Sequence, residues 1–199
     1  MNIHSRSEVE KLSKTKQEDV LEAAMQLFAE RGYDGTTVPM IAEKAKVGAG
    51  TIYRYFDSKE SLVNSLFTKC VLQLSELIRS NFPIHASVRE QFTHIYSKLF
   101  EFALYNVEGF LFINSHCDGY FLDEHSTKIF NDFIGFIINI IECGIEQGVL
   151  RPLPPIALIA LVYNPIEGLI KVMEKGELTY TAELLKGLEE SSWDAIRIN

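Results

Sequence analysis

The fold is decided by a short stretch near the amino terminus, Gly50-Thr51-Ile52-Tyr53-Arg54-Tyr55-Phe56-Asp57-Ser58-Lys59-Glu60. Ile52 and Phe56 are four residues apart, so they share one face of a short helix, expected over about Ala49–Phe56, and we expect that face to be buried. The other face then presents small, polar and aromatic side chains: Ala49, Thr51, Tyr53, Arg54 and Tyr55. Their donors suit phosphate oxygens and base edges. An ordinary three-helix cap with tyrosines packed at a seam is the alternative.

The residues before this stretch predict two further helices. Apolar residues recur with helical spacing over Lys16–Arg31, and Gly32 follows in the position of a left-handed cap. Thr37 is placed to cap a second, short helix that tolerates Pro39 in its first turn. Two short helices joined by a tight turn at residues 46–48 have the geometry of a helix-turn-helix, whose second helix enters the major groove of DNA.

The rest of the chain also keeps helical apolar spacing, and no alternating strand pattern interrupts it, which predicts an all-α fold. About nine helices are expected. The first three form a helix-turn-helix domain over residues 1–60, and a larger helical bundle occupies residues 61–199. Residues 1–13 are expected to be a frayed extension. The expected later helices are Lys59–Asn81, Ser87–Asn106, Val107–His116, Asp123–Gln147, Pro155–Lys175 and Thr179–Ser191.

Composition and charge favour a soluble cytoplasmic protein. The longest apolar runs, Phe133–Ile141 and Ile156–Tyr163, are shorter than the roughly 20 residues of a membrane span, so no membrane contact is expected. The amino terminus lacks the apolar core of a signal peptide, and the three cysteines are widely spaced. The net charge of −8 excludes binding of nucleic acid through bulk electrostatics. Any anion site therefore needs locally placed cations.

The literal string of the first third resembles the DNA-binding domain of TetR-family transcriptional repressors. The matching pattern is Leu21-x-x-Ala24-x-x-Leu27-Phe28-x-x-x-Gly32-Tyr33-x-x-Thr36-Thr37-Val38-x-x-Ile41-Ala42-x-x-Ala45-x-Val47-x-x-Gly50-Thr51-Ile52-Tyr53-x-Tyr55-Phe56-x-Ser58-Lys59-Glu60-x-Leu62. The resemblance implies a homodimer that binds double-stranded operator DNA. It also implies that residues 61–199 form a ligand-binding and dimerisation domain for a small inducer.

The resemblance carries phosphate contacts onto Thr37, Tyr53, Tyr55 and Lys59, and base or groove contacts onto Ala49 and Thr51. Three positions depart from the family pattern. Lys46 replaces a usual glycine and must accept a left-handed or strained turn. Gly48 replaces a frequent capping serine, and Ala49 a frequent Lys or Arg. The expected DNA-binding residues are Thr37, Lys46, Gly48, Ala49, Thr51, Tyr53, Arg54, Tyr55 and Lys59.

Two later helices are apolar on more than one face, which is typical of a central helix or of a surface shared with a partner. In TetR-like proteins the last two long helices pair with their symmetry mates in a four-helix bundle. Dimerisation also suits DNA reading, because two recognition helices about 34 Å apart read a palindrome. The expected interface residues are Ile129, Phe133, Phe136, Ile137, Ile140, Ile141, Ile159, Val162 and Ile166. A core helix of a monomer is the alternative.

Aromatic side chains interspersed with polar groups between residues 92 and 167 predict a cavity for a bulky, mainly hydrophobic inducer. Buried polar groups without partners are costly, so ligands, waters or mutual pairs are expected to satisfy them. The expected lining residues are Phe92, His94, Tyr96, Phe100, Tyr105, Phe110, Asn114, His116, Phe130, Tyr163 and Glu167. An aromatic core without a cavity is the alternative.

Catalytic chemistry is not expected. The chain has no CxxC, HxxxH or HExxH pair, no glycine-rich phosphate loop and no nucleophile elbow, so no catalytic residue, metal or cofactor is predicted. Two alternatives to a ligand-responsive repressor stay open here. One is an all-α enzyme using His94, His116 and Asp118. The other is a dimer that binds a protein or ligand and whose helix-turn-helix no longer reads DNA.

Overall fold

The computed structural model describes residues 15–198, and the expectation for the extension 1–13 lies outside them. The described residues form nine α-helices and no strand, which confirms the all-α prediction; Leu150 and Arg197 form an isolated β-bridge. The helices are α2 (Lys16–Arg31), α3 (Val38–Lys44), α4 (Ala49–Tyr53), α5 (Lys59–Arg79), α6 (Val88–Tyr105), α7 (Val107–His116), α8 (Glu124–Glu146), α9 (Pro155–Glu174) and α10 (Ala182–Ile196).

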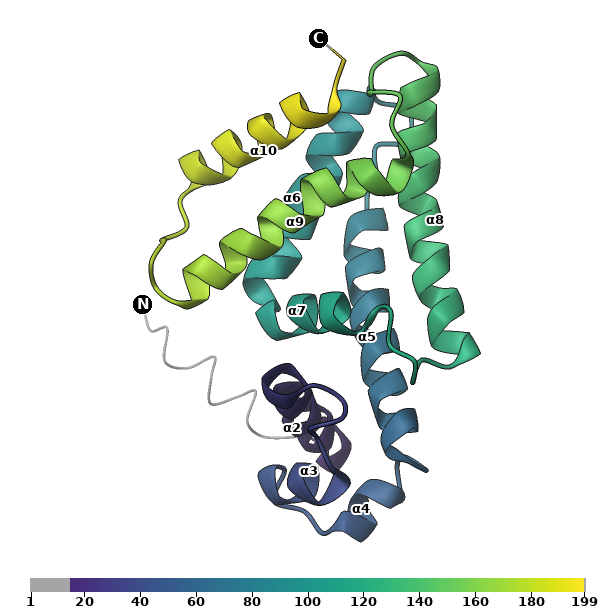
Figure 1. Cartoon of the computed structure of the whole chain (residues 1–199), viewed down its shortest axis with the longest axis vertical. Helices are drawn as coiled ribbons and strands as arrows, with labels where there is room; N and C mark the ends of the chain where they lie inside the picture. Colours follow the sequence, from purple (N-terminus) through teal and green to yellow (C-terminus); the bar gives the residue numbers. More distant parts are fainter. Residues whose placement is uncertain (1–14, 199) are drawn as a thin grey trace.

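Helices α2, α3 and α4 form a small head at one end of the molecule (Figure 1). The caps lie at the predicted positions. Gly32 ends α2 with the expected positive φ of 68°, but its ψ of 178° lies outside the left-handed helical region predicted for it; this conformation also favours glycine. The Thr37 hydroxyl accepts a hydrogen bond from the Met40 N–H, and Pro39 occupies the first turn of α3, where its missing donor is harmless.

The turn between α3 and α4 carries the strain predicted for it. Lys46 has φ 54°, in the left-handed region. Gly48 is the N-cap of α4 and provides no side-chain cap. Helix α4 is shorter than predicted. It ends at Tyr53, because the Ile52 carbonyl accepts from both Tyr55 and Phe56 and tightens the chain into a turn.

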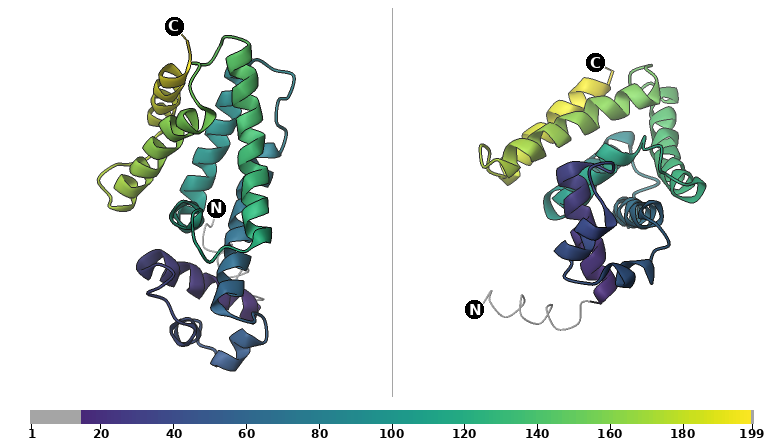
Figure 2. Two further views of the ribbon diagram at one scale, coloured as in Figure 1. Left: turned by 45° about the vertical axis from the view of Figure 1, so that its right-hand side comes forward. Right: turned by 60° about the horizontal axis from the view of Figure 1, so that its bottom comes forward.

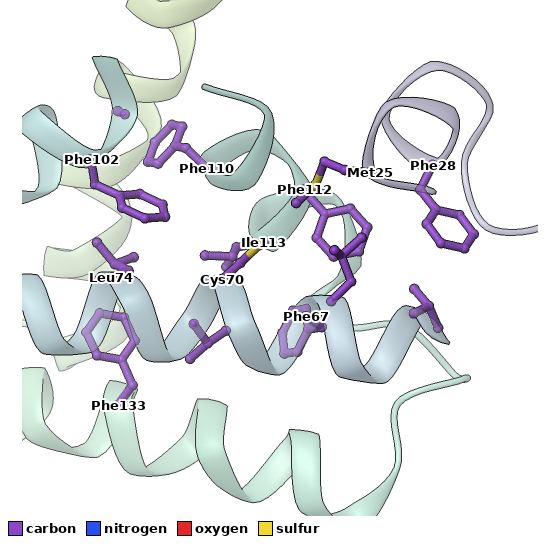
Figure 3. Packing of buried hydrophobic residues seen from close by; sticks show 14 of the residues in the cluster. Met25, Phe28, Phe67, Cys70, Leu74, Phe102, Phe110, Phe112, Ile113 and Phe133 are labelled. Carbon is purple, nitrogen blue, oxygen red and sulfur yellow. The ribbon is translucent and has the colours of Figure 1, made fainter. Parts of the chain in front are cut away.

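Helix α5 joins the head to the body. Its N-cap Ser58 accepts from the Ser61 N–H, as expected for a cap at this position, and the helix then runs alongside α8 into the bundle (Figures 1 and 2). The head and body share a continuous core. Figure 3 shows Phe28 of α2 facing Phe112 of α7, and their ring centroids are 6.1 Å apart. The head is therefore packed on the body at α7 as well as joined to it by α5.

Helices α8 and α9 leave much of their apolar surface uncovered. Only Ser126, Phe133 and Gly144 are buried on α8, and Ile156 and Leu161 of α9 are 58% and 43% exposed. By length and composition α9 is able to cross a membrane, with a mean hydropathy of 1.6 and 17% of that window buried. The apolar run judged too short in the sequence is longer, because the helix continues through Asn164 and Pro165. Here α9 packs on α6, α8 and α10.

The last helix differs from its prediction. Helix α10 begins at Ala182 and ends at Ile196, five residues beyond the expected end at Ser191. The Arg89 guanidinium holds α10 on α6 through two hydrogen bonds to Glu189, at 2.6 and 2.8 Å. The Thr93 hydroxyl donates to the same carboxylate at 2.9 Å. This clamp places Trp193 over the body of the bundle.

Candidate nucleic-acid interface and effector cavity

The expected DNA-binding residues lie together in the head, around α4 and the turns that flank it. Seven of the nine are exposed: Thr37, Lys46, Gly48, Ala49, Tyr53, Arg54 and Tyr55. Thr51 and Lys59 are half-buried. Tyr53 is 54% exposed and Tyr55 37%, whereas Ile52 and Phe56 are buried as the spacing predicted. The tyrosines are therefore not packed at a buried seam, and their hydroxyls are open to solvent or a ligand.

The exposed side chains of α4 and its following turn include a preassembled pair. The Arg54 guanidinium lies 5.2 Å from the centre of the Tyr55 ring and donates to the Tyr55 hydroxyl at 3.2 Å. Contact with the ring limits the rotamers of Arg54, so its guanidinium is held in place before any ligand binds. Arg54 and Tyr55 sit in the turn after α4 because the helix ends early at Tyr53.

Lys59 has a structural role that the sequence did not indicate. Its ammonium donates to the carbonyls of Tyr33 and Thr36, at 3.0 and 3.1 Å, and lies 3.8 Å from the centre of the Tyr33 ring. It thus ties the start of α5 to the turn after α2. An ammonium has three N–H donors, so one is left for another acceptor. Contact with a phosphate through this donor stays a prediction.

The body contains an apolar cavity of about 230 Å³. Helices α5 to α10 all contribute to its wall. No residue of the wall is an aspartate, glutamate, lysine, arginine or histidine. Of the eleven predicted lining residues, five are in the wall: Phe92, Tyr96, Asn114, Phe130 and Tyr163.

Three of the other predicted lining residues point elsewhere. Tyr105 is 86% exposed because it ends α6. The ring of His94 bonds to the Ile78 carbonyl at 2.9 Å and packs edge-on against Phe82. Glu167 pairs with Lys171 one turn along α9. Tyr105, His94 and Glu167 thus contact solvent or other protein groups. The prediction that they line the cavity is wrong for the cavity found here.

The remaining three predicted lining residues belong to the closed core. Phe100 and Phe110 are fully buried on neighbouring faces of α6 and α7. His116 is 3% exposed and stacks on Phe112, with Nδ1 within 3.0 Å of the Phe112 carbonyl. Burial lowers the pKa of this imidazole, which favours the neutral ring. His116 is a core residue between head and body.

Most of the predicted dimer-interface residues face the interior of their own chain. Phe133, Ile137, Ile140, Ile141, Ile159 and Val162 line the cavity of their own chain. Ile166 is fully buried, and Phe133 is 7% exposed, so neither is available to a partner. Phe136 packs against Phe82, and the Arg79 guanidinium lies 4.1 Å from its ring centre. One face of α8 and of α9 therefore lines the interior along successive turns, and the sequence pattern alone does not separate this face from a face available to a partner.

The head meets the cavity region through the loop between α7 and α8. Phe121 stacks on Tyr33 with ring centroids 4.1 Å apart, and the Tyr120 hydroxyl donates to Asp34 at 2.6 Å. The Tyr33 hydroxyl donates to Glu60 at 2.7 Å. Burial and the nearby Glu60 carboxylate raise the pKa of Tyr33, and the same hydrogen bond lowers the pKa of Glu60. The loop begins at Cys117, a residue of the cavity wall.

Sequence reasoning missed several parts of the site. Trp193 and Ile196 line the cavity from α10, beyond the predicted end of that helix. Their spacing with Glu189 and Ser192 continues the same helical face, and this was the available signal. The loop contacts of Tyr120 and Phe121 join residues more than eighty apart in the chain, and no local pattern predicts them.

Comparison with known proteins places these features in a family. Residues 20–66 match the model of the bacterial regulatory proteins of the tetR family, and residues 67–198 match the tetracyclin repressor-like C-terminal domain. The HTH-type transcriptional regulator YhgD of Bacillus subtilis is 27% identical over 177 residues, covering 86% of this chain and 91% of that protein. The fatty acid metabolism regulator protein of the same species is 27% identical over 143 residues, covering 71% and 74%.

Solved structures share the fold. A TetR family transcription regulator from Marinobacter aquaeolei matches with a TM-score of 0.81 and 22% identity, covering 98% of this chain and all of that one. FadR of Bacillus subtilis, solved in complex with stearoyl-CoA, matches with a TM-score of 0.63 and 22% identity, covering 88% and 95%.

A helix-turn-helix head, exposed at its second helix and packed on an all-helical body, defines a DNA-binding transcription regulator and not an enzyme. With both halves of the chain matched, the protein belongs to the TetR family of bacterial regulatory proteins.

Proposed function

We propose that the protein is a homodimeric repressor, in which residues 1–60 bind a palindromic operator and residues 61–199 bind an apolar effector that releases it. The observation that carries this proposal is the dual position of α5. Lys59, its first residue, contacts the head, while Leu74 and Ile78 of the same helix line the cavity. A ligand in the cavity therefore touches the element that starts at the DNA-binding surface.

DNA binding rests on the exposed surface around α4. Tyr53, Arg54 and Tyr55 supply hydroxyl and guanidinium donors in and directly after α4, at one end of the molecule (Figure 1), and Lys46 is exposed in the turn before α4. Ala49 and Thr51 offer methyl groups that suit thymine methyls in the major groove. Because the chain carries a net charge of −8, phosphate contacts from these few cations must orient the head.

Dimerisation rests on the uncovered apolar surface of α8 and α9. Ile156 and Leu161 of α9 are exposed, and every isoleucine of α8 is half-buried. A second copy related by a twofold axis covers such a surface with the same surface of its own. The resulting dimer presents two heads to successive turns of the operator.

The part of the effector that occupies the cavity is apolar, because the cavity wall is aliphatic and aromatic. One sequence relative is named for fatty acid metabolism, and a structural neighbour was solved with stearoyl-CoA. These names favour a hydrocarbon-chain effector here. An aromatic effector of similar size is the second candidate, since Phe92, Phe130 and Trp193 all face the cavity.

Release of DNA follows from a population shift between two arrangements of the dimer. The unliganded form holds the heads at operator spacing, and the liganded form displaces α5 and the loop before α8. An effector that prefers the displaced form ~100-fold shifts the equilibrium by ~2.7 kcal/mol. A shift of that size is sufficient to weaken operator binding about a hundredfold.

Selection of bound DNA from a random pool, followed by a gel shift of the selected sequence, tests the proposal. A palindrome bound by a dimer in a salt-sensitive manner supports it. Addition of hydrocarbon compounds to the complex then identifies the effector by release. Recovery of no sequence from the pool, with the dimer intact in sedimentation, favours the alternative of a dimer whose helix-turn-helix does not read DNA.

A further inference from the structure

The effector cavity contains no charged side chain, and its polar atoms are few. Asn114, Cys117, Tyr96, Tyr163 and Trp193 are the wall residues with side-chain polar atoms. The Cys117 thiol donates to the Asn114 carbonyl at 3.5 Å, and the Tyr96 hydroxyl bonds to Ser192. These two groups already have protein partners.

The side chains of Asn114 and Tyr163 make no hydrogen bond within residues 15–198. Tyr163 packs on Phe110, with ring centroids 5.0 Å apart. Phe110 precedes Asn114 by one turn of α7, so both lie on the same side of that helix. Asn114 of α7 and Tyr163 of α9 therefore both line the cavity on the side where α7 meets α9, and the amide and the hydroxyl keep free donor and acceptor capacity there.

The electrostatic surroundings of this pair exclude an anionic ligand group. Burial raises the pKa of Tyr163, and the Glu167 carboxylate one turn along α9 raises it further. A carboxylate brought beside Tyr163 finds no cation in the wall to pair with. A ligand ammonium gains little from Glu167, because Lys171 already pairs with it. Either charge is taken out of water without a partner, which is costly.

We propose that the cavity selects an uncharged effector whose single polar group is hydrogen-bonded by Asn114 and Tyr163. This inference rests on the proposed function of the cavity and names the chemical class of its ligand. An alcohol, ester or amide end fits the pair, whereas a free carboxylate or amine does not. By proportion to a cavity of roughly 150 Å³ that holds benzene, about 230 Å³ holds nine or ten non-hydrogen atoms.

Isothermal titration calorimetry of the full chain at pH 7 tests the inference with four probes of one chain length: 1-octanol, methyl octanoate, sodium octanoate and octylammonium chloride. We expect the two neutral probes to bind at least about tenfold more tightly than the two ions. Asn114→Leu and Tyr163→Phe each remove one hydrogen-bonding group and keep the apolar volume. Each substitution is expected to lower the affinity for 1-octanol about tenfold.

Gln73→Leu is the control, because Gln73 is exposed on α5, away from the proposed dimer surface, and absent from the cavity wall. Either of two results overturns the inference. One is an affinity for octanoate within threefold of the affinity for 1-octanol. The other is an unchanged affinity for 1-octanol in both Asn114→Leu and Tyr163→Phe. If octanoate binds best and also releases operator DNA, the inference fails and the proposed function stands. If none of the probes binds and the unliganded protein still binds its operator, the inference and the hydrocarbon effector both fail.

Discussion

The Asn64 side chain is bonded to the backbone around Phe121, fifty-seven residues away. Its Nδ2 donates to the Phe121 carbonyl at 2.8 Å, and its Oδ1 accepts from the Asp123 N–H at 2.9 Å. Asn64 is 4% exposed and sits one turn into α5, directly after the contacts with the head. The same amide therefore fixes the loop whose Phe121 ring stacks on Tyr33.

Replacing Asn64 with leucine is expected to lower the free energy of unfolding by about 1–3 kcal/mol, because two backbone groups lose their buried partner. It is also expected to reduce the release of DNA by the effector, because the loop between α7 and α8 loses its hydrogen bonds to α5 and no longer moves with it. Urea denaturation and a gel shift with effector measure the two effects. Gln73→Leu, exposed on α5, is the control. If the Asn64→Leu variant is as stable as the wild type and releases DNA equally well on addition of effector, this role of Asn64 is contradicted.

Tyr53→Phe is expected to weaken operator binding about tenfold or more, because a hydroxyl that donates to phosphate is lost while the ring stays. Fluorescence anisotropy with labelled operator measures the change. Arg54→Ala is expected to lower the slope of log affinity against log salt by about one. Tyr105→Phe, exposed in the body, is expected to change neither quantity. Equal affinities for Tyr53→Phe and Tyr105→Phe would show that DNA binds elsewhere.

Lys46→Gly is expected to stabilise the fold by up to ~1 kcal/mol, because the residue has φ 54° and glycine adopts this conformation without strain. Lys46→Ala keeps the strained backbone and removes the charge. Thermal unfolding of both variants separates the two effects, and operator affinity is expected to fall in both. A lower melting temperature for Lys46→Gly than for Lys46→Ala contradicts the strain argument.

Acid sensitivity is expected from Asp123, the N-cap of α8. Its Oδ1 accepts from the Ser126 N–H at 2.7 Å, and this bond lowers the pKa of the carboxyl group. The folded pKa lies below the unfolded one, so the stabilisation is present at neutral pH and is lost as the pH falls through the folded value. Asp123→Asn keeps a capping oxygen.

Denaturation at pH 6 and at pH 3 measures this contribution. The wild-type chain is expected to lose more free energy of unfolding between the two conditions than Asp123→Asn does. Asp118→Asn removes one exposed carboxyl group from the preceding turn and serves as the control. The same acid-induced loss in the wild type and Asp123→Asn rules out a contribution from this cap.

Two glycines of α8 are expected to respond oppositely to alanine. A Cβ at Gly144 would lie 2.7 Å from Leu150 Cδ1 and 3.0 Å from Val88 Cγ1, so Gly144→Ala is expected to cost about 1–3 kcal/mol. A Cβ at Gly135 meets no heavy atom within 4 Å, so Gly135→Ala is expected to stabilise the helix by about 0.5–1 kcal/mol. Chemical denaturation of both variants tests this pair. A gain in stability for Gly144→Ala would mean that α8 can move away from the loop at Leu150.

Local rules located the helices and their caps well. Gly32, Thr37 and Ser58 act where the sequence placed them, because each cap depends on residues within four positions. The strain at Lys46 followed in the same way from the family pattern. The predicted helix ends at Ser191, whereas α10 continues to Ile196, and Trp193 and Ile196 of this last turn line the cavity.

The sequence predicted that the body contains a mainly hydrophobic cavity, but it identified only some of the residues that line it. Helices α6 and α7 are apolar on several faces, so periodicity cannot tell Phe92, which lines the cavity, from Phe100, which lies in the closed core. His116 resembled a polar cavity group because its partners, the Phe112 carbonyl and three aromatic rings, are assembled only by folding. Contacts between distant segments decide these positions.

The 21 residues of α5 give the molecule a stiff rod about 30 Å long. A tilt of about 10° at the cavity end moves the other end by about 5 Å, more than the ~3.4 Å step between neighbouring base pairs. In the proposed dimer, the twofold axis applies that displacement to both heads in opposite directions. Under the proposed mechanism, a small expansion of the interior is magnified into a mismatch of more than one base-pair step at each half of the operator.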